Sequence, residues 1–226
     1  EGSLDTEFGE NGVFVSPVEM NLSDIAIDET GHIYMAGALL DDNIVIVKHL
    51  PTGEIDDSFG FFGASMFDFP STDQSTGIDL DSEGNIYVFG YGTLNGTTRG
   101  QISTLAPTGA INTDFTANGR KSITWPDDKD FIVSDGLFDE VTSSFYLVGR
   151  AVDEETELSN TAAVKISLDA EQDMMFNEDG WLEIDLGIGG DDFANNIIQG
   201  PGGFYLAANV AESPEGINSA IVHFNQ

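Results

Sequence analysis

The sequence lacks cysteine altogether and is poor in basic residues. Its 226 residues include 7 Lys and Arg against 40 Asp and Glu, which gives a formal net charge of -33. Without cysteine there can be no disulfide, no thiol nucleophile and no Cys-ligated zinc. The scarcity of cations excludes nucleic acid as a partner, because affinity for phosphates depends on Lys and Arg. A surface this acidic should also be repelled by anionic membranes.

Long apolar runs and familiar enzyme motifs are missing as well. No segment is long enough for a transmembrane helix, and no basic stretch followed by an apolar core opens the chain, so no signal peptide is expected within it. The sequence has no nucleophile elbow, zinc-binding His-Glu-x-x-His or phosphate-binding loop. Catalysis, if present, must therefore come from a constellation that only the fold assembles.

What the chain does have is a fourfold internal repeat. Phe8, Phe59, Phe115 and Phe176 are each followed four residues later by glycine, and four of the 5 tyrosines occupy one repeat position: Tyr34, Tyr87, Tyr146 and Tyr205. A unit of this length cannot bury its apolar face alone, so the units must stack. We place the repeats at about 2–52, 53–108, 109–168 and 169–226, within a single domain over 1–226.

Each unit predicts four short strands separated by turns. Alternating and continuous apolar stretches bounded by Asp, Asn, Gly and Pro carry this prediction. The expected strands are 22–28, 32–40, 44–50 and 64–69; 75–81, 85–93, 100–106 and 120–125; 131–138, 144–152, 161–168 and 181–186; and 193–199, 203–210 and 218–224. The last unit is one strand short, whereas 12–18 has a strand pattern and precedes the first complete unit.

This circular pattern predicts an all-β propeller of four four-stranded antiparallel blades. We expect the strand at 12–18 to pair with the last three strands and close the ring. The alternatives are half of an eight-bladed ring made by two chains, or an arc of a longer propeller. The chain is thus expected as a monomer or a dimer. Recurrent Phe and Tyr are predicted to fill the gaps between neighbouring blades.

The repeat resembles the bacterial delta-60 repeat family. The resemblance rests on the segment Gly2 to Gly12, Gly-Ser-Leu-Asp-Thr-Glu-Phe-Gly-Glu-Asn-Gly, and on Asp28 to Gly37, Asp-Glu-Thr-Gly-His-Ile-Tyr-Met-Ala-Gly. It covers the whole chain in weaker form, with Thr116 and Asn177 replacing expected glycines. The resemblance implies a propeller-forming repeat of exported bacterial proteins, hence an extracellular or cell-surface location. It supplies no catalytic motif.

Acidic and amide side chains at the expected centre of the ring are the candidate ligands. The innermost strands should point polar groups into the channel, and the candidates are Asp24, Asp79, Asp135 and Asn195. Pairs of nearby acids precede two of those strands: Asp127 and Asp128, and Asp191 and Asp192. Clustered carboxylates repel unless solvent or a cation intervenes, so a divalent cation such as calcium at the channel mouth is one hypothesis. The alternative is that these groups only meet water.

The predicted function is a non-catalytic binding or scaffold module. A rigid ring that presents acidic loops suits a protein or glycan partner, in an outer-membrane complex or an adhesin. The alternative is a lactonase-like, metal-dependent hydrolase or lyase, which needs several Asp, Asn or His side chains converging on a metal with an open position.

Overall fold

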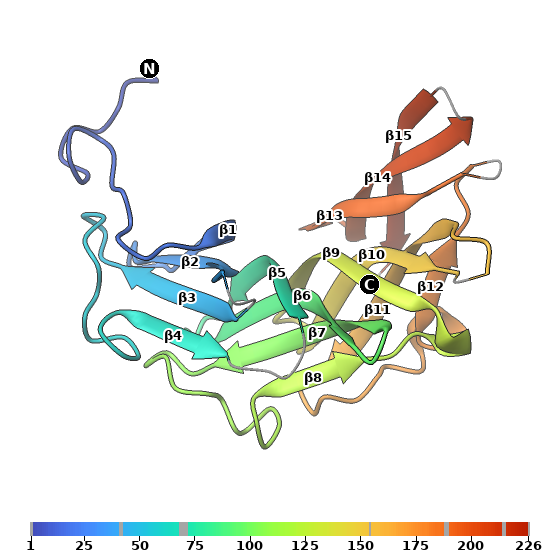
Figure 1. Ribbon diagram of the computed structural model, residues 1–226, viewed down its shortest axis with the longest axis horizontal. Coiled ribbons are helices and arrows are strands. Elements are labelled where there is room, and N and C mark those ends of the chain that lie inside the picture. Colours follow the sequence, from blue (N-terminus) through green and yellow to red (C-terminus); the bar gives the residue numbers. More distant parts are fainter. Residues whose placement is uncertain are drawn as a thin grey trace.

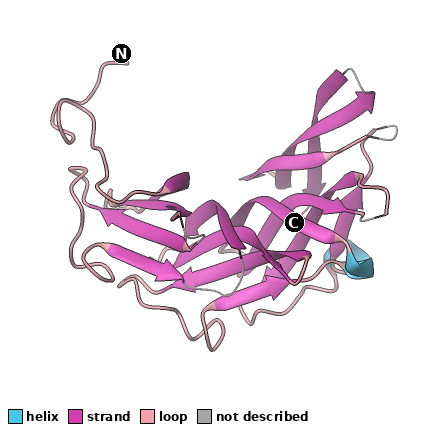
Figure 2. Ribbon diagram, in the orientation of Figure 1, coloured by secondary structure: helices cyan, strands magenta, loops and turns pink. Residues whose placement is uncertain are grey.

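A computed structural model describes residues 2–40, 43–67, 72–153, 155–187, 190–213 and 216–225. These residues form four antiparallel sheets, consecutive along the chain (Figure 1; Figure 2). Blade 1 contains β1 (Asn21–Ile27), β2 (Ile33–Ala38), β3 (Ile44–His49) and β4 (Ala64–Phe67). Blade 2 contains β5 (Thr72–Leu80), β6 (Ile86–Leu94), β7 (Thr97–Leu105) and β8 (Arg120–Ile123). Blade 3 contains β9 (Asp130–Asp139), β10 (Ser144–Val152), β11 (Ser159–Ser167) and β12 (Trp181–Ile184). Blade 4 contains β13 (Phe193–Gly200), β14 (Gly203–Ser213) and β15 (Gly216–Asn225).

The predicted strands therefore agree with the structure to within a few residues. Short 3-10 turns, η1 (Pro126–Asp128) and η2 (Phe176–Glu178), are the helical elements of the described residues. No helix in that part of the chain has the length and apolar character needed to cross a membrane.

A recurrent turn sets where the second strand of a blade begins. In blade 1, the Asp28 carboxylate accepts hydrogen bonds from the N–H groups of Thr30 (2.9 Å) and His32 (3.0 Å), and Gly31 supplies the positive φ of 86°. Burial opposes ionisation, but these bonds prevail and lower the pKa of Asp28 to about 2. Asp81 and Gly84 repeat the arrangement in blade 2.

Consecutive blades pack face to face and form the core. We call the side of a blade that looks toward the next blade its forward face, and the other its rear face. The forward face of blade 1 contributes Tyr34, Ile46 and Phe59 to a buried cluster, and the rear face of blade 2 contributes Ile86 and Val88. Similar clusters join blade 2 to blade 3 and blade 3 to blade 4.

The periodic aromatic residues lie at these junctions, as predicted: Tyr34, Phe59, Tyr87, Phe115, Tyr146 and Phe176. Tyr34 meets Phe59 with ring centroids 6.0 Å apart, and Tyr146 meets Phe176 at the same separation of 6.0 Å. Both tyrosines are buried. The repeated aromatic pair is therefore the packing unit that joins one blade to the next.

The predicted closure of a four-bladed ring is not found. Within the described residues, blade 4 has three strands, and residues 12–18 form no strand beside β15. The blades form an open arc whose two ends lie apart (Figure 1). Residues 3–19 instead pack against blade 1: the Gly9 N–H donates to the Thr52 carbonyl at 2.9 Å, and the Phe14 ring meets His49 at 5.1 Å. These contacts hold that segment at the opposite end of the arc from β15.

Truncating Phe59 tests whether the junction aromatics carry stability. Phe59 is 1% exposed, so Phe59→Ala should lower the free energy of unfolding by about 3–5 kcal/mol through lost burial and the cavity it leaves. The neighbouring Phe61 is 79% exposed, and Phe61→Ala should change it by about 0.5 kcal/mol or less. Urea unfolding of both variants checks this, and equal losses would show that the periodic position is not special.

Candidate functional site at the inner edge of the blades

The innermost strands β1, β5 and β9 carry three carboxylates that bridge neighbouring blades. The Asp24 Oδ2 accepts the N–H of Ile78 at 3.1 Å, and the Asp79 Oδ2 accepts the N–H of Phe138 at 2.8 Å. The Asp135 Oδ2 accepts the N–H of Ile197 at 3.0 Å. We call these three bonds the inner clamps. Each joins an innermost strand to the innermost strand of the next blade.

The second oxygen of each carboxylate is held by its own strand. The Oδ1 atoms of Asp24, Asp79 and Asp135 accept the N–H of the following residue, each at 2.8 Å. A carboxylate that receives two N–H bonds is fixed in position. Each oxygen has two lone pairs, so each keeps capacity for another partner, except the Asp135 Oδ2, which accepts a second hydrogen bond from the Asn196 Nδ2.

Electrostatics join the three carboxylates into one group. Burial, and then the charges of Asp24 and Asp79, raise the pKa of Asp135 to about 6, even though the N–H groups of Ile197 and Gly136 oppose the shift. Burial also raises the pKa of Asp79, and the charge of Asp24 adds to this. A carboxyl group that is half protonated near neutral pH can donate or accept a proton.

The fourth predicted inner residue is displaced by a β-bulge. The pairing of β13 with β14 shifts between Ala194 and Asn196, so Asn195 is the extra, exposed residue. Asn196 reaches the site instead, and its Nδ2 donates to the Asp135 Oδ2 at 2.7 Å. Sequence reasoning missed Asn196 because a bulge changes which side chain faces inward and leaves no pattern in a single strand. Irregular pairing at a matching point recurs in β1, β5 and β9.

The predicted acidic loops hold the blades farther from the inner edge. Asp191 accepts the N–H of Ser159 at 3.1 Å, which ties blade 4 to β11 of blade 3. Asp192 is buried, and it accepts the N–H groups of Leu186 (2.6 Å) and Ala211 (3.1 Å). A buried carboxylate needs such partners. We predicted these acids as cation ligands, whereas the structure shows them accepting hydrogen bonds from backbone N–H groups.

The remaining loop residues give no further ligand geometry. Asp127 is exposed in the left-handed region, with φ of 57°, and the side chain of Asp128 lies outside the described residues. Asp130, the next acid along the chain, accepts the Thr98 N–H at 2.6 Å, just as Asp191 accepts the Ser159 N–H. Over the described ranges, no group of three or more His, Asp or Glu side chains is arranged to hold a metal ion. Calcium binding stays a prediction.

A separate groove of about 640 Å³ lies between blades 2 and 3 and is lined by Asp81, Glu83, Tyr87, Phe138 and Glu140, among others. Asp81 spends its oxygens on the turn, accepting the Asn85 N–H at 2.8 Å and the Tyr87 hydroxyl at 2.7 Å. Residues 81–85 thus form an Asp-Gly turn.

Comparison with known proteins identifies the repeat. A model described as "Beta-propeller repeat" matches residues 62–95, which run from the end of blade 1 into blade 2. The chain carries a beta-propeller repeat. This confirms the recognition of a propeller-forming repeat from sequence and agrees with the delta-60 resemblance. No match was found among curated protein sequences.

Several solved structures are similar to this chain, all with TM-scores below 0.5. A GH43 β-1,3-galactosidase is 10% identical with a TM-score of 0.47, and the match covers 88% of this chain and 41% of that one. An α-L-arabinofuranosidase from Clostridium thermocellum is 13% identical with a TM-score of 0.47, covering 81% and 59%. A GH43 endo-arabinanase from Bacillus licheniformis is 11% identical with a TM-score of 0.36, covering 88% and 92%. The chain thus spans about half the length of the first two.

These findings correct the predicted function. The matching structures are glycoside hydrolases, which overturns our prediction of a non-catalytic scaffold for a protein or glycan partner. A search for motifs in the sequence cannot detect carboxylates that come together only when separate strands align. The identities and TM-scores transfer no substrate and no catalytic residue to this chain.

The titration of Asp135 tests the electrostatic coupling. Carboxyl-detected NMR should show a midpoint of about 6 for Asp135, and Asp24→Asn should lower that midpoint because it removes a neighbouring negative charge. The midpoint should stay above the ordinary value of 3.8, since burial is the larger cause. Asp130→Asn removes the carboxylate at the first residue of β9, which does not contribute to the shift of Asp135, and should leave the midpoint unchanged.

The same raised pKa fixes the sign of a stability effect. The folded state holds the Asp135 proton more tightly than the unfolded chain, so this group stabilises the fold fully below pH 3.8. Its contribution is lost as the pH rises to about 6. The loss should be smaller in Asp135→Asn, and an unfolding free energy with the same pH slope in both proteins would contradict the assignment.

Proposed function

We propose that the chain is the propeller of a glycan-hydrolysing protein, with acid–base chemistry at the inner edge of blades 1 to 3. One observation carries the proposal: three carboxylates on adjacent innermost strands influence one another, and the pKa of Asp135 is raised to about 6. Hydrolysis of a glycosidic bond requires one protonated and one ionised carboxyl group in a shared site. Environments that separate the pKa values of neighbouring carboxyls meet this requirement.

The roles follow from the electrostatics. Protonated Asp135 donates its proton to the glycosidic oxygen as the bond to the anomeric carbon breaks. Asp24, across the inner edge, accepts the proton of the water that attacks that carbon, so the total charge of the two carboxyl groups does not change. The starting state returns when Asp24 releases this proton and Asp135 takes one up. The inner clamps hold both side chains in place, which favours catalysis because little reorganisation is needed.

The names of the similar structures serve only to choose the first substrates. Arabinan and β-1,3-galactan oligosaccharides should be tested, because those enzymes are named for related activities. Support for the chemistry itself comes from the inner-edge carboxylates of this chain.

Release of reducing sugar from this panel tests the function. Hydrolysis should fall as the pH rises above about 6, because Asp135 loses its proton. Asp135→Asn should lower kcat/KM by about 100-fold or more, the usual effect of removing an acid–base group. No hydrolysis of any member of the panel would contradict the proposal.

A matched variant separates catalysis from structure. Asp130→Asn also weakens a carboxylate bond between blades, the one to the Thr98 N–H, but Asp130 is the first residue of β9 and forms none of the three inner clamps. Its kcat/KM should stay within about threefold of the wild-type value, because the substitution removes no acid–base group. Equal losses in both variants, with equal falls in melting temperature, would assign Asp135 a structural role alone.

A further inference from the structure

The N-terminal segment, residues 3–19, adopts the loop that leads into the outer strand of a blade. Three backbone hydrogen bonds close both this loop and the loop before β4, with matching lengths. In the segment they run from Phe8 N to Asp5 O (3.1 Å), Gly12 N to Phe8 O (2.8 Å) and Glu10 N to Val13 O (2.7 Å). Before β4 they run from Phe59 N to Asp56 O (3.0 Å), Gly63 N to Phe59 O (2.8 Å) and Phe61 N to Ala64 O (2.7 Å).

The segment also sits on blade 1 as an outer strand sits on the following blade. The Gly9 N–H donates to the Thr52 carbonyl at 2.9 Å, and the Gly60 N–H donates in the same way to the Thr108 carbonyl at 2.8 Å. The N-terminal segment therefore occupies the place of the outer strand of a blade that would precede blade 1.

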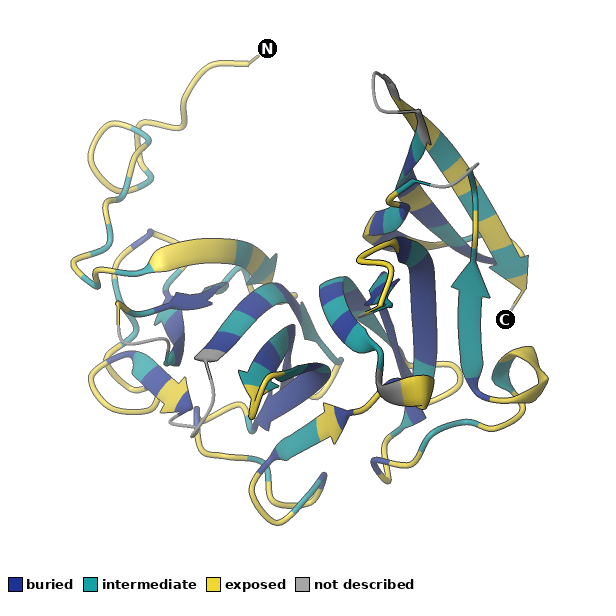
Figure 3. Cartoon of the chain, turned by 45° about the vertical axis from the view of Figure 1, so that its right-hand side comes forward, coloured by how far each residue is buried: buried dark blue, intermediate teal, exposed yellow. Residues whose placement is uncertain are grey.

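Blade 4 has the complementary deficit. Blades 1 to 3 each have an outer strand, β4, β8 or β12, whereas the described residues of blade 4 end at β15. The forward face of blade 4 is bare and apolar, with Ile217 74% and Ile221 80% exposed. The rear face of blade 1 is uncovered at β1, where Ile25 is 52% and Ile27 61% exposed (Figure 3), whereas Val47 and His49 of β3 on the same face are buried. Apolar faces of this kind are buried at every other junction.

Side chains at the two ends complete the repeat pattern. In blades 1 and 3, a lysine of the third strand pairs with the aspartate of the following loop: Lys48 with Asp56 at 3.2 Å and Lys165 with Asp173 at 3.0 Å. At the matching positions, β15 carries His223 and the N-terminal segment carries Asp5. Tyr205, stacked on His223 at 4.4 Å, matches Tyr34, whose partner Phe59 corresponds to Phe8.

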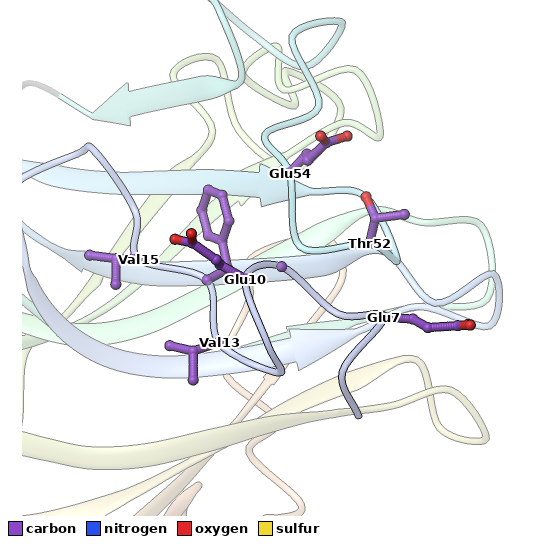
Figure 4. Close-up of a pocket in the computed structure, with 8 residues that line it drawn as sticks. Glu7, Glu10, Val13, Val15, Thr52 and Glu54 are labelled. Carbon is purple, nitrogen blue, oxygen red and sulfur yellow. The ribbon is translucent and has the colours of Figure 1, made fainter. Parts of the chain in front are cut away.

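An opening beside the N-terminal segment leaves room for a third strand of another blade, which would pair with it. It has a volume of about 620 Å³, and Val13, Phe14, Val15 and Glu54 line it (Figure 4). In blade 1, the matching residues of β4 pair with β3, with Ala64 opposite Val47. By this equivalence Val13 lies opposite Val222 of β15.

We propose that the N-terminal segment of one copy of the chain pairs with β15 of a second copy, and that two copies form a continuous ring. The occupant is a second copy because each junction within the chain is fixed by a buried cluster and an inner clamp. Closing one chain on itself would require all of these junctions to change, since its ends lie apart (Figure 1). A second copy meets both ends with the junctions unchanged.

An engineered disulfide tests the pairing in the full chain, which contains no cysteine of its own. Oxidised Val13→Cys/Val222→Cys should run at twice the chain mass without reductant and return to the chain mass with it, because opposite residues of paired strands are within disulfide reach. Val13→Cys/Ile221→Cys, whose side chains point to opposite faces, should give at least fivefold less. A disulfide within one chain, a ladder of longer products, or no disulfide would each overturn the proposal.

A backbone variant supplies an independent test. By equivalence with β3, whose Lys48 N–H donates to Gly63 at 3.0 Å, the Ile221 N–H points to the free edge of β15. Ile221→Pro removes that donor, whereas Ile221→Thr keeps it and removes similar apolar area. Sedimentation equilibrium should give a dimer dissociation constant at least tenfold larger for the proline variant than for the threonine variant. A monomeric wild-type chain, or equal effects of both variants, would overturn the proposal.

Discussion

Each blade has two apolar faces, and only another blade can cover them. This constraint explains why the sequence must repeat, why aromatic residues recur at fixed positions, and why the ends of the arc differ from its middle. Ile46 of β3 is 0% exposed because the following blade covers it. Ile221 has an equivalent place in the fold but no such cover in the described chain, and it is 80% exposed. The contribution of such an apolar residue to the stability of the fold thus depends on whether a neighbouring blade covers it.

Most of the strands could be predicted from sequence because their signals are local. Asp-Gly turns, apolar alternation and the periodic Phe and Tyr specify where strands begin and which residues are buried. The closure of the ring could not be predicted in this way, because it depends on the angle between blades, to which many contacts contribute. Gly12 to Val18 has a strand-like pattern, yet these residues form no strand where the structure describes them.

The candidate site could be predicted only in outline. Asp24, Asp79 and Asp135 were found by their repeat positions, and the structure brings their charges within reach of one another. Their bonds to the next blade could not be foreseen, because each joins residues more than 50 positions apart. The exchange of Asn195 for Asn196 has another cause, a bulge that shifts the register by one residue.

The inner clamps also connect the site to the proposed ring. At the junction between copies, the counterpart of Asp24 and Asp135 is Asn196, and the matching N–H, that of Ile25 in the second copy, already donates to the Asp24 Oδ1 of its own strand at 2.8 Å. An amide oxygen is a weaker acceptor than a carboxylate, since its hydrogen bonds are not charge-assisted. Asn196 is also held by Asp135 through its Nδ2. The junction between copies would thus lack the charged bond present at the other three, so it would be the first to separate. Separation of this junction would disturb Asp135 directly, because Asn196 lies at the junction and also donates to Asp135.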